Sequence, residues 1–335
     1  MSGSPRRMAI ALALALAVST IVALVIGPGE LGIGTVVRAL LHGPVDAASE
    51  DSHAALVWTL RLPRALLAAM VGAALASAGA ITQGLFRNPL ADPSVLGVSL
   101  GAALAAVIGF VVGLDAGGVW VTPLLAAGGA GATLALLFAI ASLRPHTTSL
   151  LLAGIAIGAS AGALTTCLLA IAGDRVDLGI KVVRWLMGSF EGRSWAHLFG
   201  AAPPIAIALV AASALARDLD ALVLGDEAAR SLGVSIDRTQ KLAMATVAVL
   251  VGAATAVAGV LGFLGLVVPH VVRWRVGADH RHVVPLSALL GAVVLLVVDT
   301  GTRASPLPLP PGVVTSLLGA PMFLVILLRH DRRAE

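Results

Sequence analysis

Charge is scarce in this chain: only 12% of its 335 residues are Asp, Glu, Lys or Arg, against about 25% in soluble domains. Hydrophobic residues make up 58% of the chain, and the mean hydropathy is +0.99. So few charges do not cover the surface of a soluble enzyme of this size, and the apolar content excludes a disordered chain. The long apolar stretches lack the alternation of outer-membrane strands. The composition therefore indicates an all-α polytopic membrane protein.

Cysteine and lysine are nearly absent, and each shortage excludes a kind of site. The single cysteine, Cys167, lies in an apolar run, which leaves no disulfide within the chain and no cysteine-based metal cluster. The two lysines, Lys181 and Lys241, stand outside any Gly-Lys-Ser/Thr motif, so the chain has no P-loop for ATP. If ATP drives the activity, another subunit hydrolyses it. We expect no metal site, and no basic stripe with aromatics points to nucleic acid.

Hydropathy predicts ten apolar segments, counting one that is too short for an ordinary span. The first, Met8–Ile26, follows two arginines and is interpreted as an uncleaved span rather than a signal peptide. The short one, Phe263–Val276, contains Pro269 and is expected to be a short or broken helix, or a re-entrant segment. The other eight are Thr59–Gln83, Ser94–Val112, Val119–Ser142, Ser149–Ala172, Ala196–Ala216, Arg238–Val260, Val283–Gly301 and Val313–Leu328.

The distribution of basic residues orients these segments. With ten crossings and a cytoplasmic N-terminus, most of the 22 arginines and lysines fall on the cytoplasmic side, which favours both termini inside. If the short segment does not cross, the C-terminus lies on the other side. We therefore predict one transmembrane domain over residues 1–335, with cytoplasmic tails at 1–7 and 329–335 and a long cytoplasmic loop at about 217–237.

The sequence carries weak signals for two functional classes, an intramembrane hydrolase and an ion-coupled carrier. Ser99 and Ser160 each stand in a Gly-x-Ser-x-Gly pattern, but that nucleophile pattern needs a strand–turn–helix elbow, and both lie in apolar, helix-like runs. Asp299 is the one acid inside a predicted span, and an ion pair with Arg303, four residues on, explains it more simply than ion coupling. An intramembrane hydrolase and an ion-coupled secondary carrier remain alternatives.

A set of motifs runs in order from about residue 59 to residue 329: Arg61-Leu-Pro-Arg64, Gln83-Gly-Leu-Phe-Arg-Asn-Pro-Leu-Ala-Asp-Pro93, Leu150-Leu-Leu-Ala-Gly154, Leu224-Gly-Asp-Glu-Ala-Ala-Arg-Ser-Leu-Gly233, Gly262-Phe-Leu-Gly-Leu-Val-Val-Pro-His270, Asp279-His-Arg281 and Pro311-Gly-Val-Val-Thr-Ser-Leu-Leu-Gly-Ala-Pro-Met-Phe323. This ordered set resembles the permease subunit of bacterial ABC importers for vitamin B12, ferric siderophores and haem. The resemblance implies a vitamin-B12-importer-like permease fold of about ten transmembrane helices in the bacterial inner membrane. It also implies a homodimer, two ATPase subunits that carry ATP and Mg²⁺ on the cytoplasmic side, and a periplasmic binding protein. This chain itself is expected to bind no cofactor.

The resemblance also implies roles for particular residues. A short helix in the long loop is expected to couple to the ATPase through Leu224, Gly225, Asp226, Glu227, Ala228, Arg230 and Gly233. Docking of the binding protein is expected at Arg61, Arg64 and Arg303, by charge. The alternative for the loop helix is a solvated connector without a partner. The alternative for the arginines is that they snorkel to the membrane interface, and at Arg303 it is an ion pair with Asp299.

The resemblance also implies two gates along the translocation path. Thr147 and Thr148, after His146, match a cytoplasmic gate, and Asn88 and Leu90 match a second constriction; helix capping is the alternative for the threonines.

Substrate contacts are expected at His270, since imidazole ligates haem iron, and at Arg184, within the group Arg175, Lys181, Arg184 and Arg193 that attracts anionic groups or only contacts the binding protein. His280 and His282 are expected to be solvated. The run Trp185-Leu-Met-Gly-Ser-Phe is slightly closer to haem permeases, so haem is the first expectation, with a siderophore or vitamin B12 as the alternative.

Overall fold

The computed structural model describes residues 4–27, 29, 31–43, 52–143, 147–172, 175–307 and 309–331. Within these ranges every regular element is a helix and no strand occurs. The main helices are α1 (Pro5–Val25), α4 (Leu62–Leu85), α5 (Val98–Val112), α6 (Val121–Leu143), α7 (Thr147–Ile171), α9 (Trp195–Val223), α11 (Ile236–Ala258), α12 (Leu264–Val276), α13 (His280–Ala304) and α14 (Pro311–Asp331). The shorter elements are α2 (Ile33–His42), α3 (Ser52–Leu56), α8 (Val176–Leu186), α10 (Asp226–Ser231), a π-helical turn at Val57–Arg61 and 3₁₀ turns at Pro93–Leu96 and Leu114–Gly117.

All ten segments predicted from hydropathy are helices, and the all-α polytopic fold is confirmed. Among the described residues, seven helices are long and apolar enough to cross a membrane, while α5 and the first part of α14 are shorter apolar helices. The short segment is α12, with 13 residues and a proline inside. Its N-cap residue, Phe263, has a φ of +66°, so the backbone turns sharply where α12 begins.

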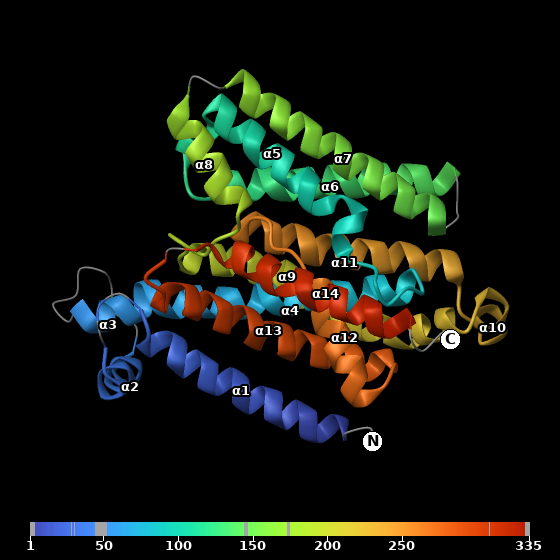
Figure 1. The fold of residues 1–335 in the computed structure, drawn as a ribbon, viewed down its shortest axis with the longest axis horizontal. Helices are drawn as coiled ribbons and strands as arrows, with labels where there is room; N and C mark the ends of the chain where they lie inside the picture. The colour runs from blue at the N-terminus through green and yellow to red at the C-terminus, as the bar shows by residue number, and fades with distance from the viewer. Residues whose placement is uncertain are drawn as a thin grey trace.

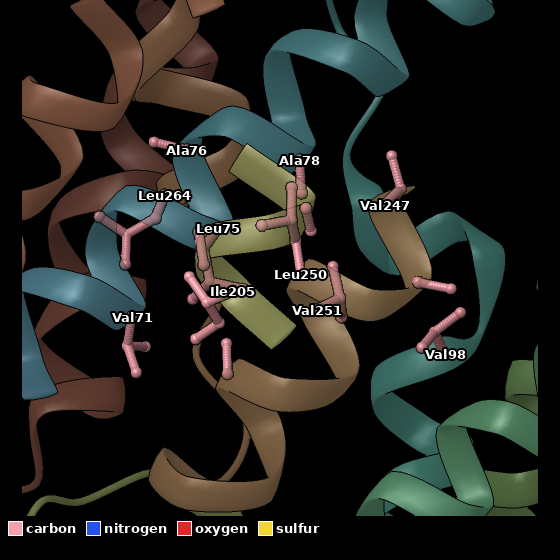
Figure 2. Close-up of a cluster of buried hydrophobic side chains, with 14 of the residues drawn as sticks. Val71, Leu75, Ala76, Ala78, Val98, Ile205, Val247, Leu250, Val251 and Leu264 are labelled. Carbon is pink, nitrogen blue, oxygen red and sulfur yellow. The ribbon is translucent and has the colours of Figure 1, made fainter. Parts of the chain in front are cut away.

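Helix α4 forms the centre of the bundle. It packs against α13, α11, α9 and α12. In the span His53–Leu85, which contains α4, 78% of the most apolar stretch is buried, against 11% for α1. In Figure 1, α5 to α8 lie on one side of this centre and α1 lies on the other. Figure 2 shows Val71, Leu75 and Ala78 of α4 beside Leu250 of α11 and Ile205 of α9. The buried apolar contacts are therefore concentrated among the central helices around α4. The peripheral helices, such as α1, expose apolar side chains on the outer surface of the bundle.

Small residues let α4 approach its neighbours closely. A side chain at Gly72 would overlap the backbone carbonyl of Gly291 in α13, and one at Gly79 would overlap the carbonyl of Gly265 in α12. Such approaches are how membrane helices gain packing without a hydrophobic driving force between them. The glycines at these two positions thus serve packing within the subunit.

The structure corrects the predicted long loop at 217–237. Residues 217–223 continue α9, because Leu219 and Leu222 are buried on the face that already carries the core contacts of this helix. Only short connections flank α10. At the C-terminus, the predicted tail from 329 is helical as far as Asp331.

Helices α2 and α8 were not predicted. Each is amphipathic and only 10 or 11 residues long, below the length of a span. They lie at the end of the bundle opposite α10 (Figure 1). The beginning of α1 and the end of α14 lie at the α10 end, which fits an even number of crossings.

Candidate functional site

Helix α10 projects from one end of the bundle (Figure 1). Gly225 before it has a φ of +107° and Gly233 after it a φ of +80°, conformations that glycine adopts without strain. Asp226 and Glu227 occupy its first turn and Arg230 its last. The acids therefore face the positive end of the helix dipole and the arginine the negative end. The predicted short helix in this loop is confirmed, with these boundaries.

One residue anchors α10, and two others offer apolar surface. Ala229 is fully buried, and its carbonyl accepts a hydrogen bond from the backbone N–H of Val234 at 3.0 Å. Leu224 is 68% exposed before the helix, and Leu232 is 64% exposed after it. Leu232 was not singled out in the sequence, although it stands one residue after the helix that Leu224 precedes by two. Asp226 and Glu227 are exposed as well, so both charged and apolar side chains are exposed on and beside α10.

An ion pair joins α10 to the loop that follows α4. Arg87, which has a φ of +50°, donates from Nη2 to the carboxylate of Asp226. The hydrogen bond from Arg87 lowers the pKa of Asp226 below its ordinary value. Because both side chains are well exposed, the pair contributes little stability by itself. It positions α10 relative to the loop that holds Asn88 and Leu90.

Asn88 shapes that loop through its own hydrogen bonds. Its Oδ1 accepts from the backbone N–H of Leu90 at 2.9 Å, and its backbone N–H donates to the carbonyl of Gln83 at 3.1 Å. Asn88 is exposed and Leu90 is half-buried. The asparagine thus closes a local turn of the kind its short side chain favours, while its gate role stays a prediction.

The other predicted gate lies at the start of α7. Thr147 begins this helix and Thr148 is its second residue. Their side chains, and the whole of His146, lie outside the described residues. The gate role of the two threonines stays a prediction.

Arg61, predicted for docking, is inside the protein and only 4% exposed. Its guanidinium donates to the carbonyls of Leu24 at 2.6 Å and Val25 at 2.7 Å. It also donates to the carbonyls of Gly27 and Gly29. Leu24 and Val25 belong to the last turn of α1, whose carbonyls lack helical partners, and Gly27 and Gly29 follow the helix. Arg61 therefore fastens the end of α1 to the start of α4.

Arg64 and Arg303 converge on Asp299, whose side chain is fully buried. Arg64 donates from Nη2 at 2.7 Å and from Nε at 3.0 Å, a bidentate pair. Arg303 Nε lies 3.3 Å from the same carboxylate, and its Nη atoms donate to the carbonyls of Ile26 and Ala23. The predicted ion pair of Asp299 with Arg303 is confirmed; the stronger partner, Arg64, was not foreseen.

This arginine cluster (Arg61, Arg64 and Arg303) is therefore engaged within the subunit. Arg64 is the most exposed of the three side chains, at 20%, and Arg303 is 9% exposed. A partner's carboxylate would have to compete with Asp299 for Arg64 and with backbone carbonyls for the others. Docking at these residues stays a prediction, and Arg64 is its most accessible member.

His270 and Arg184 lie on different elements. His270 is half-buried on α12, with its ring 4.8 Å from that of Trp274 in an edge-to-face contact. Arg184 is exposed on α8 and lines a cavity of about 640 Å³ together with Lys181, Arg193 and Asp177. His270 does not line that cavity. The structure thus does not bring the two predicted substrate contacts into one site.

The two histidines at the start of α13 differ from expectation. His282 is well exposed, as predicted, but His280 is only 3% exposed. The prediction for His280 is wrong because α4 and α9 cover it: its Nδ1 lies 2.6 Å from the carboxylate of Asp220, and Gly84 leaves it space. Its polar neighbours, Asp220 and Arg273, were not assigned a role from the sequence, nor was Gln83, which accepts a hydrogen bond from Arg273.

Comparison with known proteins gives the family. The model of the FecCD transport family matches residues 15–329. The chain belongs to the FecCD transport family. It is 41% identical over 295 residues to the cobalamin import system permease protein BtuC of Halobacterium salinarum, covering 87% of this chain and 78% of that protein. It is 42% identical over 286 residues to the hemin transport system permease protein HmuU of Yersinia pestis, covering 82% and 84%.

A solved structure agrees with this assignment. It is described as an inward-facing conformation of a metal-chelate type ABC transporter, and it superposes with a TM-score of 0.86 at 30% identity over 97% of this chain and 100% of that one. The resemblance to ABC importer permeases stated from the motifs is therefore confirmed. This FecCD permease is a multi-span protein of the inner membrane.

The hydrolase alternative lacks its structural context in this FecCD chain. Ser99 lies in the first turn of α5 and Ser160 within α7, and the Ser160 hydroxyl donates to the carbonyl of Ala156 at 2.9 Å. Neither serine stands on a strand-to-helix turn, which the nucleophile pattern requires. Within the described ranges, no group of three or more His, Cys, Asp or Glu side chains is placed to hold a metal ion.

Proposed function

We propose that this chain is the transmembrane permease subunit of an ATP-driven importer that moves an iron chelate, haem first, from periplasm to cytoplasm. In this proposal residues 1–335 form one permease domain that binds no cofactor. Two copies form a homodimer, with two ATP-binding subunits, which carry ATP and Mg²⁺, against α10. Both termini are cytoplasmic, and a periplasmic binding protein docks at the opposite end.

The observation that carries the proposal is α10. It is a short helix between two glycines with positive φ, outside the bundle, with exposed leucines at both ends and acids in its first turn. A solvated connector needs neither a buried anchor such as Ala229 nor an apolar exposed surface. The relatives named as import permeases support reading this surface as the contact with the motor subunit.

Haem leads the substrate proposal, and a ferric siderophore or vitamin B12 is the alternative. The named hemin permease supports haem, and Arg184 offers an exposed cation to propionates beside a cavity of about 640 Å³. The similarity to the cobalamin permease is of the same degree, which supports the alternative as well. Asn88, Leu90, Thr147 and Thr148 are proposed as gate residues on the α10 side.

Reconstitution tests the proposal. In proteoliposomes with the ATPase and the loaded binding protein, uptake should require ATP, and replacing Asp226 and Glu227 with alanine should reduce both bound ATPase and uptake. Asp237→Ala, an exposed acid at the start of α11, is the matched control. Uptake that persists without nucleotide or ATPase would favour the ion-coupled carrier and overturn the importer.

The substrate is tested on the binding protein itself. Haem, a ferric siderophore and cobalamin are titrated separately against the purified partner, and the tightest ligand is then followed in the uptake assay. Haem should be both bound and transported. Transport of cobalamin or a siderophore with no haem uptake would replace the substrate while leaving the importer function intact.

A further inference from the structure

A chain of polar side chains, with His280 and Gln83 buried and Asp220 and Arg273 half-buried, starts in the last turn of α9, the helix that precedes α10. The carboxylate of Asp220, near the end of α9, accepts from the backbone N–H of His280 at 2.9 Å and lies 2.6 Å from its Nδ1. The other ring nitrogen, Nε2, is 3.3 Å from Nη2 of Arg273. Because a guanidinium only donates hydrogen bonds, Nε2 accepts from Arg273. The ring proton is therefore on Nδ1, which donates a hydrogen bond to the carboxylate of Asp220. This geometry sets one tautomer of a neutral imidazole.

The chain of contacts continues from α12 to α4. Arg273 donates from Nη1 to Oε1 of Gln83, and Gln83 Nε2 donates to the carbonyls of Gly265 and Leu266 at 3.3 Å and 3.1 Å. Gln83 is only 3% exposed. Both polar atoms of its amide are therefore hydrogen-bonded to α12. The oxygen accepts from the last turn of that helix, and the nitrogen donates to carbonyls of the first turn.

Pro269 explains why the start of α12 needs this amide. A proline has no N–H, so the carbonyl four residues before it, that of Gly265, lacks its helical partner. Gly265 is also pressed against the backbone at Gly79, where a side chain would not fit. Gln83 thus satisfies a buried carbonyl at the point where α12 is fixed to α4.

The start of α12 in turn borders a cavity. Gly262 and Phe263 line a space of about 610 Å³ with residues of α14 and the end of α8, among them Ser316 and Met187. Phe263 also packs against Gly319 of α14, where a side chain would overlap its ring. A displacement at the start of α12 would therefore change both this cavity and the packing of α14.

We propose that Asp220, His280, Arg273 and Gln83 form a polar relay that transmits movement of the α9–α10 end to the start of α12. The inference rests on the proposed function, because α10 is the contact with the ATPase. Asp220 lies in the last turn of α9, six residues before α10 begins. The four residues are positioning residues: they touch neither nucleotide nor substrate, and they couple ATPase docking to the cavity beside α14.

The test measures substrate transported per ATP hydrolysed in the complete complex. Arg273→Gln should lower this ratio between about twofold and thirtyfold, the range for residues along a coupled network, while co-purified ATPase stays unchanged. Arg273→Lys should restore part of it. The matched control is Arg275→Gln, an exposed arginine of the same helix. Gln83→Glu tests the last link alone, because it keeps the acceptor for Arg273 and loses the donor to α12.

Several outcomes decide the relay. The double variant Gln83→Leu with Arg273→Gln, which leaves no buried charge unpaired, should be no worse than the more severe of its two single variants, since both break one chain. An unchanged ratio in Arg273→Gln, fully additive effects, or equal loss of transport and of bound ATPase would overturn the relay. If Arg273→Gln does not fold, Gln83→Glu and His280→Gln are judged by the same ratio. A parent complex without ATP-dependent transport would instead refute the proposed function.

Discussion

Replacing Asp299 with asparagine removes the charge at the centre of the arginine cluster while keeping the shape of the side chain. Asp299 is fully buried and holds Arg64 bidentately, with Arg303 at 3.3 Å. Breaking a buried pair by removing one partner costs about 3–5 kcal/mol. We expect the lower end, about 3 kcal/mol, because Arg64 is 20% exposed and Arg303 keeps its backbone carbonyls.

The magnitude translates into a measurable shift. With an unfolding entropy of about 2.1 cal/mol/K per residue, 3 kcal/mol lowers the Tm of a chain of this length by about 4 °C. Thermal unfolding of the detergent-purified permease at one fixed scan rate measures it. Asp177→Asn, an exposed acid of α8, is the control and should leave the Tm unchanged.

A second variant separates the ion pair from simple loss of packing. Adding Arg64→Gln to Asp299→Asn removes the uncompensated charge, so part of the lost stability should return. A Tm for Asp299→Asn equal to that of the parent would refute the reasoning that this buried pair holds α1, α4 and α13 together. A double variant less stable than Asp299→Asn would refute the charge argument specifically.

Two further predictions concern packing and pH. Gly79→Ala should prevent correct folding or strongly reduce the yield of monodisperse protein, because a Cβ would overlap the carbonyl of Gly265, whereas Gly128→Ala, with nothing within 4 Å, should be neutral or slightly stabilising. Asp279 caps α13 and pairs with Arg281, whose hydrogen bond lowers the pKa of this acid to about 2. Because that pKa is depressed, its stabilisation is present above the unfolded value of about 4 and is lost as pH falls toward 2; Asp279→Ala should cost about 1 kcal/mol at neutral pH and flatten the acid limb of a stability–pH curve. A parent-like curve for Asp279→Ala would contradict this assignment.

The bundle itself was largely predictable because hydropathy is a local sum along the chain. Ten apolar segments were predicted and all ten are helices, including α12, whose proline and length set it apart. The amphipathic helices α2 and α8 were missed because neither reaches span length and each carries three polar or charged residues among its apolar ones. Residues 217–223 were assigned to a loop because Arg217, Asp218 and Asp220 raise the local polarity, although Leu219 and Leu222 continue the buried face of α9.

The candidate site was predictable only where it is local. The caps and charges of α10 are readable within one short segment, and so is the i,i+4 pair of Asp299 with Arg303. The bidentate partner of Asp299, Arg64, is 235 residues away in sequence. No pattern in the residues around Arg64 predicts this contact. Gln83 did leave a signal, a polar amide within an apolar helix, but its meaning depends on Pro269 in another helix.

The sequence by itself determined that this is a membrane-spanning protein and that the chain has no P-loop. It also determined which permease family the chain resembles. These properties depend on composition, on short motifs and on their order, all of which can be read along the chain. The tertiary structure decided which charges face one another: it turned the arginine cluster inward onto Asp299 and the end of α1, and buried His280 between Asp220 and Arg273. The physical reason is that in a low-dielectric bundle a scarce charge must find a partner, and helix crossings, not sequence separation, determine which partner is within reach.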